Sequence, residues 1–416
     1  MRVANMVQMV FNAVVLSVIG CAMLSFSECV YADVTVSNVT AHQLDSSNGY
    51  VRISYDISCT TEYAYVEIQA VDVEGGSNLL TQTFYPTVVT KGHESGHHET
   101  LWHAAADIGI GSLFPSVRYD VTAYETPPLY CVIDLSKGKT ATHYPVSALH
   151  SLPENGWTDE YKTNKLVLRW IPPGSYLRRT GVEDNAPIHS VTMTKGYYIG
   201  VFEVTQRQYE LVTGSRPSFF RHSDYYATRP VENCSYNMIR GGTVGAGWPQ
   251  TDVVDESSFL GILCRKTGLK FDLPTEAQWV FANVGGVDGR YCQNSGWSDM
   301  VDGGGPKYKD IDSLRDCSFG TAQVGSYSPN GNGIYDMNGN VCEWCLDWWE
   351  SLRDRLDVDV VDPKGPLRGS ERLMMGGDWQ SMWLQDWRGS ALPWISTDAV
   401  YSGYDGYGFR LARTLH

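Results

Sequence analysis

The chain has 416 residues and a formal net charge of -15, and 43% of its residues are hydrophobic. This length favours two domains, each with a core of its own. The acidic balance excludes electrostatic attraction to nucleic acid or to an anionic lipid surface, so neither is expected as a partner.

Residues 1–32 have the layout of a secretory signal peptide. Arg2 precedes a long apolar run, and Ala32 completes a small-residue cleavage site. A membrane anchor would need about 20 apolar residues and basic flanks, and is less favoured. Lipid attachment at Cys21 is the other alternative, but the residues after it stay apolar. The sequence therefore predicts a secreted or periplasmic protein with no membrane contact beyond the signal peptide.

Residues 33–140 carry short alternating patterns that are typical of strands. From Val51 to Cys59 every second residue is apolar or a cysteine, which is the pattern of a half-buried strand, and similar patterns follow near Val66 and Val117. Turn clusters separate these segments. The region is predicted to be an all-β, immunoglobulin-like sandwich.

A histidine-rich stretch, GHESGHHETLWH, lies in this region. It could hold a metal ion, but no cysteine or carboxylate is placed to complete a ligand set. A solvated turn is the favoured interpretation. Residues 141–164 lack periodicity and contain Pro, Asn, Gly and Asp, so they are predicted to be a linker.

Residues 165–416 are rich in glycine and tryptophan, and their predicted helices are few and short. Thr205 and Gln208 form a capping box that opens a helix ending at Gly214, and Thr275 opens another in the same way. A third helix is expected over residues 256–266. The remainder needs many tight turns.

Six motifs follow one another in this second half, and together they resemble the formylglycine-generating enzyme family, also called the sulfatase-modifying factor family. They are LVLRWIPPGSYLRR, PIHSVTMTKGYYIGVFEVTQRQYELVTG, RPVENCS, LPTEAQW, NGNGIYDMNGNVCEWCLDWW and GGDWQ…GYGFRLAR. The resemblance implies a mixed α/β, loop-rich fold of the C-type-lectin-like kind over residues 165–416. The whole protein would then be multidomain, with the β-sandwich first.

Active members of this family carry two cysteines after a Gly-Gly-Ser turn, which bind copper(I) and oxidise a substrate cysteine to formylglycine. Counted from Gly376-Gly377, these positions are Ser381 and Asp386 here, and the serine has become Asp378. Copper(I) prefers soft thiolate ligands, which a hydroxyl and a carboxylate are not. Copper is therefore not expected as a cofactor.

Cys342 and Cys345 form a CxxC pair within the fifth motif. Redox CxxC pairs lie at a helix start in a βαβ setting, which the surrounding sequence does not show. Packing or a local disulfide is the favoured interpretation, with a redox pair and a zinc site as the alternatives.

The resemblance also implies a structural calcium ion at DMNGNVCE. Its ligands would be the side chains of Asp336 and Glu343 and the backbone carbonyls of Gly339 and Val341. Calcium takes six to eight oxygen ligands in flexible geometry, which a glycine-kinked loop with two carboxylates can supply. The alternative is a plain Asn-Gly turn whose acids face water.

Three tryptophans follow the Gly-Gly pair at four-residue spacing. Trp379 corresponds to an aromatic packing residue of the family. Trp383 and Trp387 are candidates for either a core or a ligand groove. With their charged neighbours they define the predicted groove residues, which are Asp378, Trp383, Asp386, Trp387 and Arg388.

The favoured function is an exported binding or accessory protein without the copper dithiolate, whose ligand is a peptide, a protein or a glycan. The alternative is an active formylglycine-generating oxidase or maturase that acts on a cysteine of sulfatase-like proteins. Iron-dependent sulfoxide synthases share the fold, but they normally add a helical domain with a histidine triad, which residues 33–164 do not resemble.

Overall fold

A computed structural model describes residues 34–45, 49–88, 90–109, 117–179, 188–221, 223–284, 320–350, 358–379, 394–395 and 405–415. The predicted signal peptide lies outside these residues. Within the described ranges, no helix is long and apolar enough to cross a bilayer.

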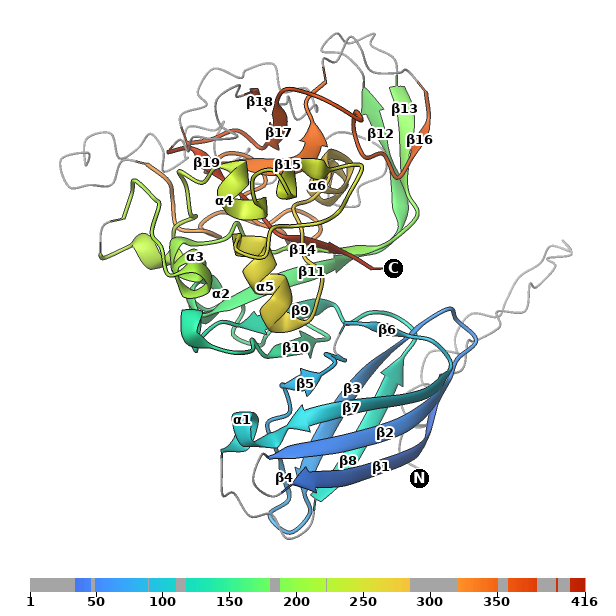
Figure 1. Ribbon diagram of the computed structural model, residues 1–416. Helices are drawn as coiled ribbons and strands as arrows, with labels where there is room; N and C mark the ends of the chain where they lie inside the picture. Colours follow the sequence, from blue (N-terminus) through green and yellow to red (C-terminus); the bar gives the residue numbers. More distant parts are fainter. Residues whose placement is uncertain are drawn as a thin grey trace, which may run out of the picture. The chain divides into compact units, whose positions relative to one another are not determined.

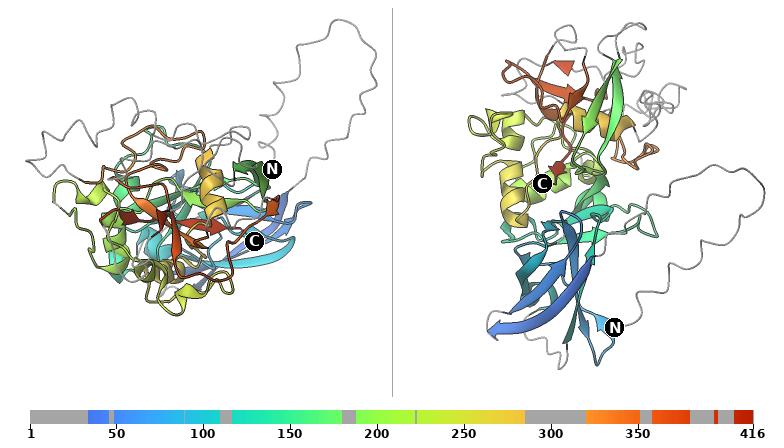
Figure 2. Two further views of the ribbon diagram at one scale, coloured as in Figure 1. Left: turned by 90° about the horizontal axis from the view of Figure 1, so that it is seen from above. Right: turned by 90° about the vertical axis from the view of Figure 1, so that its right-hand side faces the viewer.

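The N-terminal region is built of antiparallel strands in two sheets (Figure 1). In the first, β2 pairs with both β1 and β7 (Figure 1), and β5 pairs with β7; the long blue strands also lie side by side in the right-hand view of Figure 2. In the second, β4 and β6 pair with different parts of β3, and β8 also pairs with β3. Their bounds are β1 Thr35–Asp45, β2 Tyr50–Ser58, β3 Ala64–Asp72, β4 Ser77–Asn78, β5 Phe84–Tyr85, β6 Gly92–His93, β7 Gly96–His103 and β8 Val117–Tyr124, with the helix α1 at Ala104–Ile108. The predicted strands are present, while an immunoglobulin-like topology stays a prediction.

The predicted histidine-rich turn is instead strand: its residues form β6 and β7. His97 contacts the Asp56 carboxylate at 2.6 Å, and His98 contacts the Glu94 carbonyl oxygen at 2.8 Å. The expectation of a solvated turn was wrong because the cross-strand pairing of β7 with β2 organises this segment, and the local sequence does not reveal that pairing.

A five-stranded antiparallel sheet, in the order β10-β9-β11-β14-β20, forms the base of the C-terminal fold. The strands are β9 Tyr130–Asp134, β10 Val146–Leu149, β11 Lys165–Ile171, β14 Tyr197–Gly200 and β20 Ala412–Thr414. The stretch predicted to be a linker contains β10 and the helix α2, Glu160–Thr163. It also contributes to this sheet, because β10 pairs with β9 and β9 pairs with β11.

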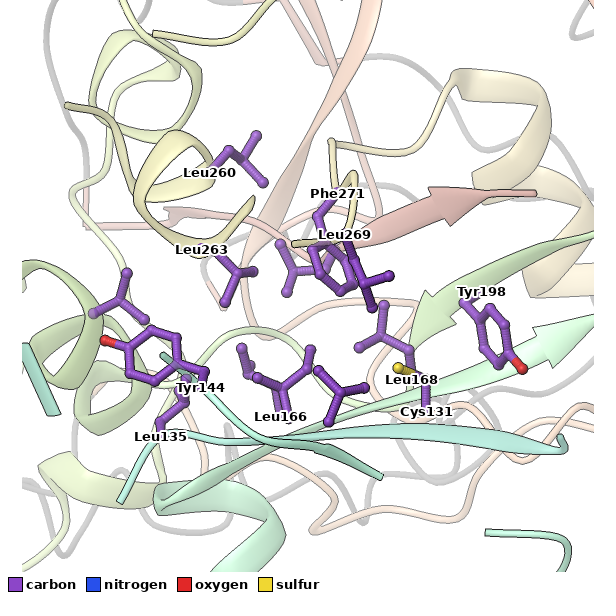
Figure 3. Close-up of a cluster of buried hydrophobic side chains, with 14 of the residues drawn as sticks. Cys131, Leu135, Tyr144, Leu166, Leu168, Tyr198, Leu260, Leu263, Leu269 and Phe271 are labelled. Atoms are coloured by element: carbon purple, nitrogen blue, oxygen red, sulfur yellow. The ribbon is translucent and has the colours of Figure 1, made fainter. Parts of the chain in front are cut away.

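A hydrophobic core lies between this sheet and the helix α5, Phe259–Thr267 (Figure 3). Leu260 and Leu263 point from the helix toward Leu166 and Leu168 of β11. All four side chains are at most 4% exposed. Their burial fixes the sheet against α5 and so supports the loops on the other side of the fold.

Among the described residues, two smaller sheets and three further helices accompany this core (Figure 1). One sheet pairs β12 Gly174–Arg179, β13 Ile188–Met193 and β16 Val360–Val361, and the other pairs β15 Cys342–Trp348, β17 Arg372–Met375, β18 Trp394–Ile395 and β19 Tyr407–Gly408. The helices are α3 Gln206–Thr213, α4 Tyr236–Arg240 and α6 Glu276–Val284, and single 3-10 turns lie at Gly138–Thr140, Tyr226–Thr228 and Gly245–Gly247.

The predicted helix starts are confirmed. Thr205 caps α3 through a complete capping box, and Gly214 ends that helix in the left-handed conformation. At α6, the Gln278 amide N–H donates to the Thr275 hydroxyl at 3.1 Å, while the Gln278 side chain accepts from the Thr275 amide at 3.0 Å. These bonds join residues three apart, so the sequence alone can specify them.

Candidate functional site

The candidate site begins where strand β17 ends at a glycine pair. Gly376 and Gly377 have φ values of 95° and 73°, a region that side chains disfavour. Two hydrogen bonds hold this turn to the predicted calcium loop. The Gly339 N–H donates to the Gly376 carbonyl at 2.7 Å, and the Trp379 N–H donates to the Asn340 carbonyl at 2.9 Å. The two motifs that the sequence singled out are therefore neighbours.

Trp379 is a packing residue, which confirms the expectation for this position. Its side chain is 7% exposed, and its ring meets Phe220 edge to face with centroids 5.3 Å apart. The indole N–H donates to the Asp405 carbonyl at 3.1 Å. The tryptophan thus joins the segment around residue 220 to the segment around residue 405.

Asp378 and Asp405 contribute two carboxylates to the candidate site beside the glycine pair. A Cβ atom on Gly406 would lie 2.3 Å from a carboxylate oxygen of Asp378, so the aspartate packs directly against that glycine. Burial raises the pKa of Asp405, and the charge of Asp378 raises it further. The position where the family carries a serine is therefore part of an acidic surface.

The other predicted groove residues, Trp383, Asp386, Trp387 and Arg388, lie outside the described residues, and so does Ser381. The groove roles of the first four, and the loss of copper ligands at Ser381 and Asp386, stay predictions from the sequence.

The predicted calcium ligands Asp336 and Glu343 are both buried, at 4% and 1% exposed. Asp336 accepts a hydrogen bond from the Gly325 amide at 2.6 Å. Glu343 is paired with Arg410, through contacts of 2.6 Å to one carboxylate oxygen and 2.8 Å to the other. The Trp279 indole N–H also donates to Glu343, at 2.7 Å.

A third carboxylate, Glu203, completes this buried centre. It accepts hydrogen bonds from the Asn340 side-chain amide at 2.6 Å and from the Val341 backbone amide at 3.2 Å. Burial raises the pKa of Glu203 well above its usual value, and the charges of Asp336 and Glu343 raise it further. Three carboxylates therefore act on the single guanidinium of Arg410.

The charge of this centre fits a hard cation, but Glu343 is already engaged by a cationic side chain. Both oxygens of Glu343 already accept hydrogen bonds from Arg410. Among the residues that the structure describes, no group of three or more His, Cys, Asp or Glu side chains is arranged to hold a metal ion. A calcium ion would have to share Glu343 with Arg410. Binding through Asp336, Gly339, Val341 and Glu343 therefore stays a prediction.

Cys342 and Cys345 lie three residues apart on strand β15. Side chains at this spacing point to opposite faces of a strand. Cys342 accordingly packs into the core that contains Trp344 and Cys345 into the core that contains Trp279. Both side chains are buried. The packing interpretation is confirmed, and a disulfide, redox or zinc pair is wrong because the two sulfur atoms do not face each other.

Sequence reasoning assigned no role to Glu232, Glu203, Arg410 or Asp405, although the quoted motifs contain the first three and Asp405 directly precedes GYGFRLAR. Glu232 is fully buried and accepts hydrogen bonds from two consecutive backbone amides. A charged residue inside an apolar motif is the one signal that could have pointed to such a role.

Comparisons with known proteins show the family of the C-terminal part. Residues 158–415 match the model of the Sulfatase-modifying factor enzyme 1-like domain. The Formylglycine-generating enzyme of Streptomyces coelicolor is 37% identical over 115 residues, which are 26% of this chain and 35% of that protein. The Serine/threonine-protein kinase pkn1 of Chlamydia pneumoniae is 28% identical over 246 residues, which are 57% of this chain and 36% of that protein.

The chain thus spans about a third of the length of these curated relatives. Among solved structures, Treponema denticola variable protein 1 aligns with 60% of this chain and 95% of its own, at 22% identity and a TM-score of 0.44.

Proposed function

The chain belongs to the sulfatase-modifying factor enzyme 1-like family through residues 158–415, and on this premise we propose that it is a binding or accessory member that does not oxidise cysteine. Its ligand would be a peptide, a protein or a glycan. The domain has relatives that are formylglycine-generating enzymes, but one fold can host both catalysis and binding.

The observation that carries this proposal is the absence of thiols at Ser381 and Asp386. The described cysteines offer no replacement pair. Burial raises the pKa of the Cys234 and Cys345 thiols well above their usual value, and that of Cys264 to about 11. These groups stay protonated at neutral pH, whereas copper(I) binding and thiol redox chemistry need thiolates.

The remaining site has the chemistry of a binding surface. Asp378 and Asp405 present carboxylates beside the buried Trp379. The predicted groove residues Trp383, Asp386, Trp387 and Arg388 continue directly from this point along the chain. Aromatic and charged side chains in one groove are typical of protein and peptide recognition.

Three further parts of the proposal come from the sequence. Residues 1–32 direct export to the periplasm or the medium. The region from residue 33 to 140 is an immunoglobulin-like sandwich. Calcium at the Asp336–Glu343 loop is a structural cofactor, with no role in chemistry.

The alternative is an active oxidase, and one assay separates the two. Purified protein is incubated with a Cys-x-Pro-x-Arg peptide, copper and O₂, and aldehyde is measured by hydrazide capture and mass spectrometry. We expect no aldehyde above a control without protein. Turnover that a copper chelator abolishes would overturn the proposal. The double variant Ser381→Cys/Asp386→Cys supplies thiols at both positions. If this variant binds copper(I) and the parent protein does not, the loss of copper binding is due to these two residues.

A further inference from the structure

The segment that follows helix α3 (Figure 1) is unusually rich in arginine. This arginine-rich segment comprises residues 215–221 and 223–229, and it contains three arginines, no lysine and one acidic residue. Arg216 and Arg221 are exposed, and Arg229 is half-buried. The whole chain, by contrast, has 47 acidic residues against 32 basic ones. A local excess of positive charge on so acidic a chain marks the segment as a candidate for binding an anion.

Two of these arginines are stacked on tyrosine rings. The guanidinium carbon of Arg216 lies 3.9 Å from the ring centroid of Tyr226. That of Arg229 lies 3.9 Å from the ring centroid of Tyr225. The Arg216 Nη2 atom also donates to the Arg221 carbonyl oxygen at 3.4 Å. Stacking occupies the face of a planar guanidinium, whereas its N–H donors lie at the edge, so both groups are held in place before a ligand binds.

Arg229 lacks an acceptor of the kind that other buried arginines have. Its Nη1 atom is buried and makes no hydrogen bond to the part of the chain that the structure describes. The side chains of Arg240 and Arg410 instead donate to the carboxylates of Asp272 and Glu343, respectively. Burial lowers the pKa of Arg229 because it disfavours the charged form. An anion beside this guanidinium would offset a charge that the fold leaves uncompensated.

The composition of the segment favours the carboxylates of a peptide over other anions. The planar fork of arginine pairs with a carboxylate through two parallel hydrogen bonds, which the ammonium group of lysine cannot do. Three guanidinium groups along one segment suit a ligand with several negative groups better than one small anion. Anionic membranes are usually bound by clusters of about four to eight basic residues, and the net charge of -15 opposes binding to membranes and nucleic acid.

We propose that the arginine-rich segment is a docking surface for an acidic peptide segment of a partner protein, whose carboxylates pair with Arg216 and Arg229. Tyr225 and Tyr226 are positioning residues, because they hold the two guanidinium groups in place. The inference goes beyond the proposed function, since it applies whether or not the domain oxidises cysteine.

The test uses the purified protein and a fluorescein-labelled peptide, Gly-Glu-Gly-Gly-Glu-Gly-Gly-Glu-Gly, with binding followed by fluorescence anisotropy. A counterpart peptide has glutamine in place of each glutamate. Inorganic phosphate is the small-anion probe, and a chondroitin sulfate tetrasaccharide is the glycan probe. We expect the glutamate peptide to bind at least about tenfold more tightly than its glutamine counterpart, and we expect added salt to weaken that binding.

Arg216→Gln and Arg229→Gln should each weaken binding of the glutamate peptide roughly tenfold, because each removes a charge-assisted contact. Arg265→Gln is the matched control and should leave the affinity unchanged. Arg265 is also exposed and also donates to a backbone carbonyl oxygen, that of Glu256 at 3.0 Å, but it lies on helix α5. Denaturation midpoints establish that each variant is folded. Arg216 is exposed, so its variant tests the surface even if Arg229→Gln is unstable.

Two variants of Tyr226 test the positioning role. Tyr226→Leu removes the ring under Arg216 and should weaken binding about threefold, whereas Tyr226→Phe keeps the ring and should retain the affinity of the parent. Equal affinities of the two variants would overturn the positioning role, because a contact of the ring with the guanidinium would then make no difference.

Equal binding of the two peptides, unchanged affinity in both arginine variants, or an equal loss in Arg265→Gln would each overturn the inference. Displacement of the peptide by phosphate at equal concentration would reduce the surface to a site for small anions. Tighter binding of the tetrasaccharide would assign the surface to a sulfated glycan, and either result would overturn a peptide partner. The proposed function is decided separately by aldehyde formation, which does not depend on these variants.

Discussion

Glu343 and Glu232 are both buried carboxylates, but they lie in different surroundings. Glu343 faces the guanidinium of Arg410, which is fully buried and also donates to backbone carbonyl oxygens of Gly200 and Tyr335, both at 2.8 Å. Glu232 accepts from two backbone amides of a surface segment, and burial is the largest cause of its raised pKa. One carboxylate joins core elements, and the other positions an exposed loop.

This difference shows how one residue type serves two purposes in the same domain. A buried ion pair holds together segments that are far apart in the chain, and its loss leaves an uncompensated charge. A carboxylate that accepts only from amides can take up a proton instead of keeping its charge. Removal of the first should therefore strongly destabilise the domain, whereas removal of the second should mainly alter the loop and its pH response.

The largest effect is expected at the ion pair. Arg410→Met leaves Glu343, Glu203 and Asp336 without their cation, and breaking a buried pair on one side costs about 3–5 kcal/mol. Chemical denaturation measures the loss. The double variant Arg410→Met/Glu343→Gln removes one of the stranded charges and should regain part of the stability. If the double variant is no more stable than Arg410→Met, uncompensated charge is not the cause.

Loss of calcium should have the next largest effect on stability. This experiment tests whether Arg410 is the only cation of the buried centre. An ion that binds only the native state stabilises it by about 2.7 kcal/mol at a hundredfold excess over Kd. A chelator should then lower the melting temperature of the C-terminal domain, and Glu343→Ala should make that temperature insensitive to the chelator. Identical melting curves of the parent with calcium and with chelator would contradict the site and leave Arg410 as the sole cation of the centre.

Glu232 should make the stability depend on pH. Burial raises its pKa from 4.5 to about 7, against the opposing effect of the two amide hydrogen bonds. Because the folded state holds the proton more tightly than the unfolded chain, this contribution is full below pH 4.5 and is lost as the pH rises through 7. At 1.36 kcal/mol per pKa unit, the change is roughly 3 kcal/mol.

Glu232→Gln cannot ionise, so it should show a flatter profile than the parent over this range. Denaturation of both proteins from pH 4 to pH 8 isolates Glu232 from Asp347, whose pKa burial also raises to about 7. Parallel profiles for the two proteins would show that Glu232 does not titrate in this window.

The smallest stability effects are expected at the predicted groove tryptophans. Trp383→Ala and Trp387→Ala should shift the free energy of unfolding by less than about 1 kcal/mol if the two rings face a groove. Trp379→Ala is the control for a buried ring and should cost about 3–5 kcal/mol. Denaturation midpoints separate the two classes. Losses of the Trp379 size at Trp383 and Trp387 would place them in the core and remove the groove.

The local features of the fold were predictable from the sequence, and the helix starts show why. Thr205 and Thr275 cap helices through residues three positions away, so their partners are fixed by the chain itself. The turn at Gly376 and Gly377 is also a local feature, because its positive φ values suit a residue without a side chain. The histidine-rich strand was predicted wrongly as a turn, and several roles were left open for the CxxC pair. In both cases strand pairing decides which way the side chains point.

By itself the sequence determined the family and the absence of thiols at Ser381 and Asp386, since motif order and residue identity are properties of the chain. Only the tertiary structure decided which partner each buried charge would meet. Glu343 meets Arg410 across 67 positions, and Glu232 meets the Phe219 amide across 13. A carboxylate removed from water must take whichever donors the packed core brings within reach. Those donors depend on how sheets and loops assemble, which the neighbouring residues in the chain do not specify.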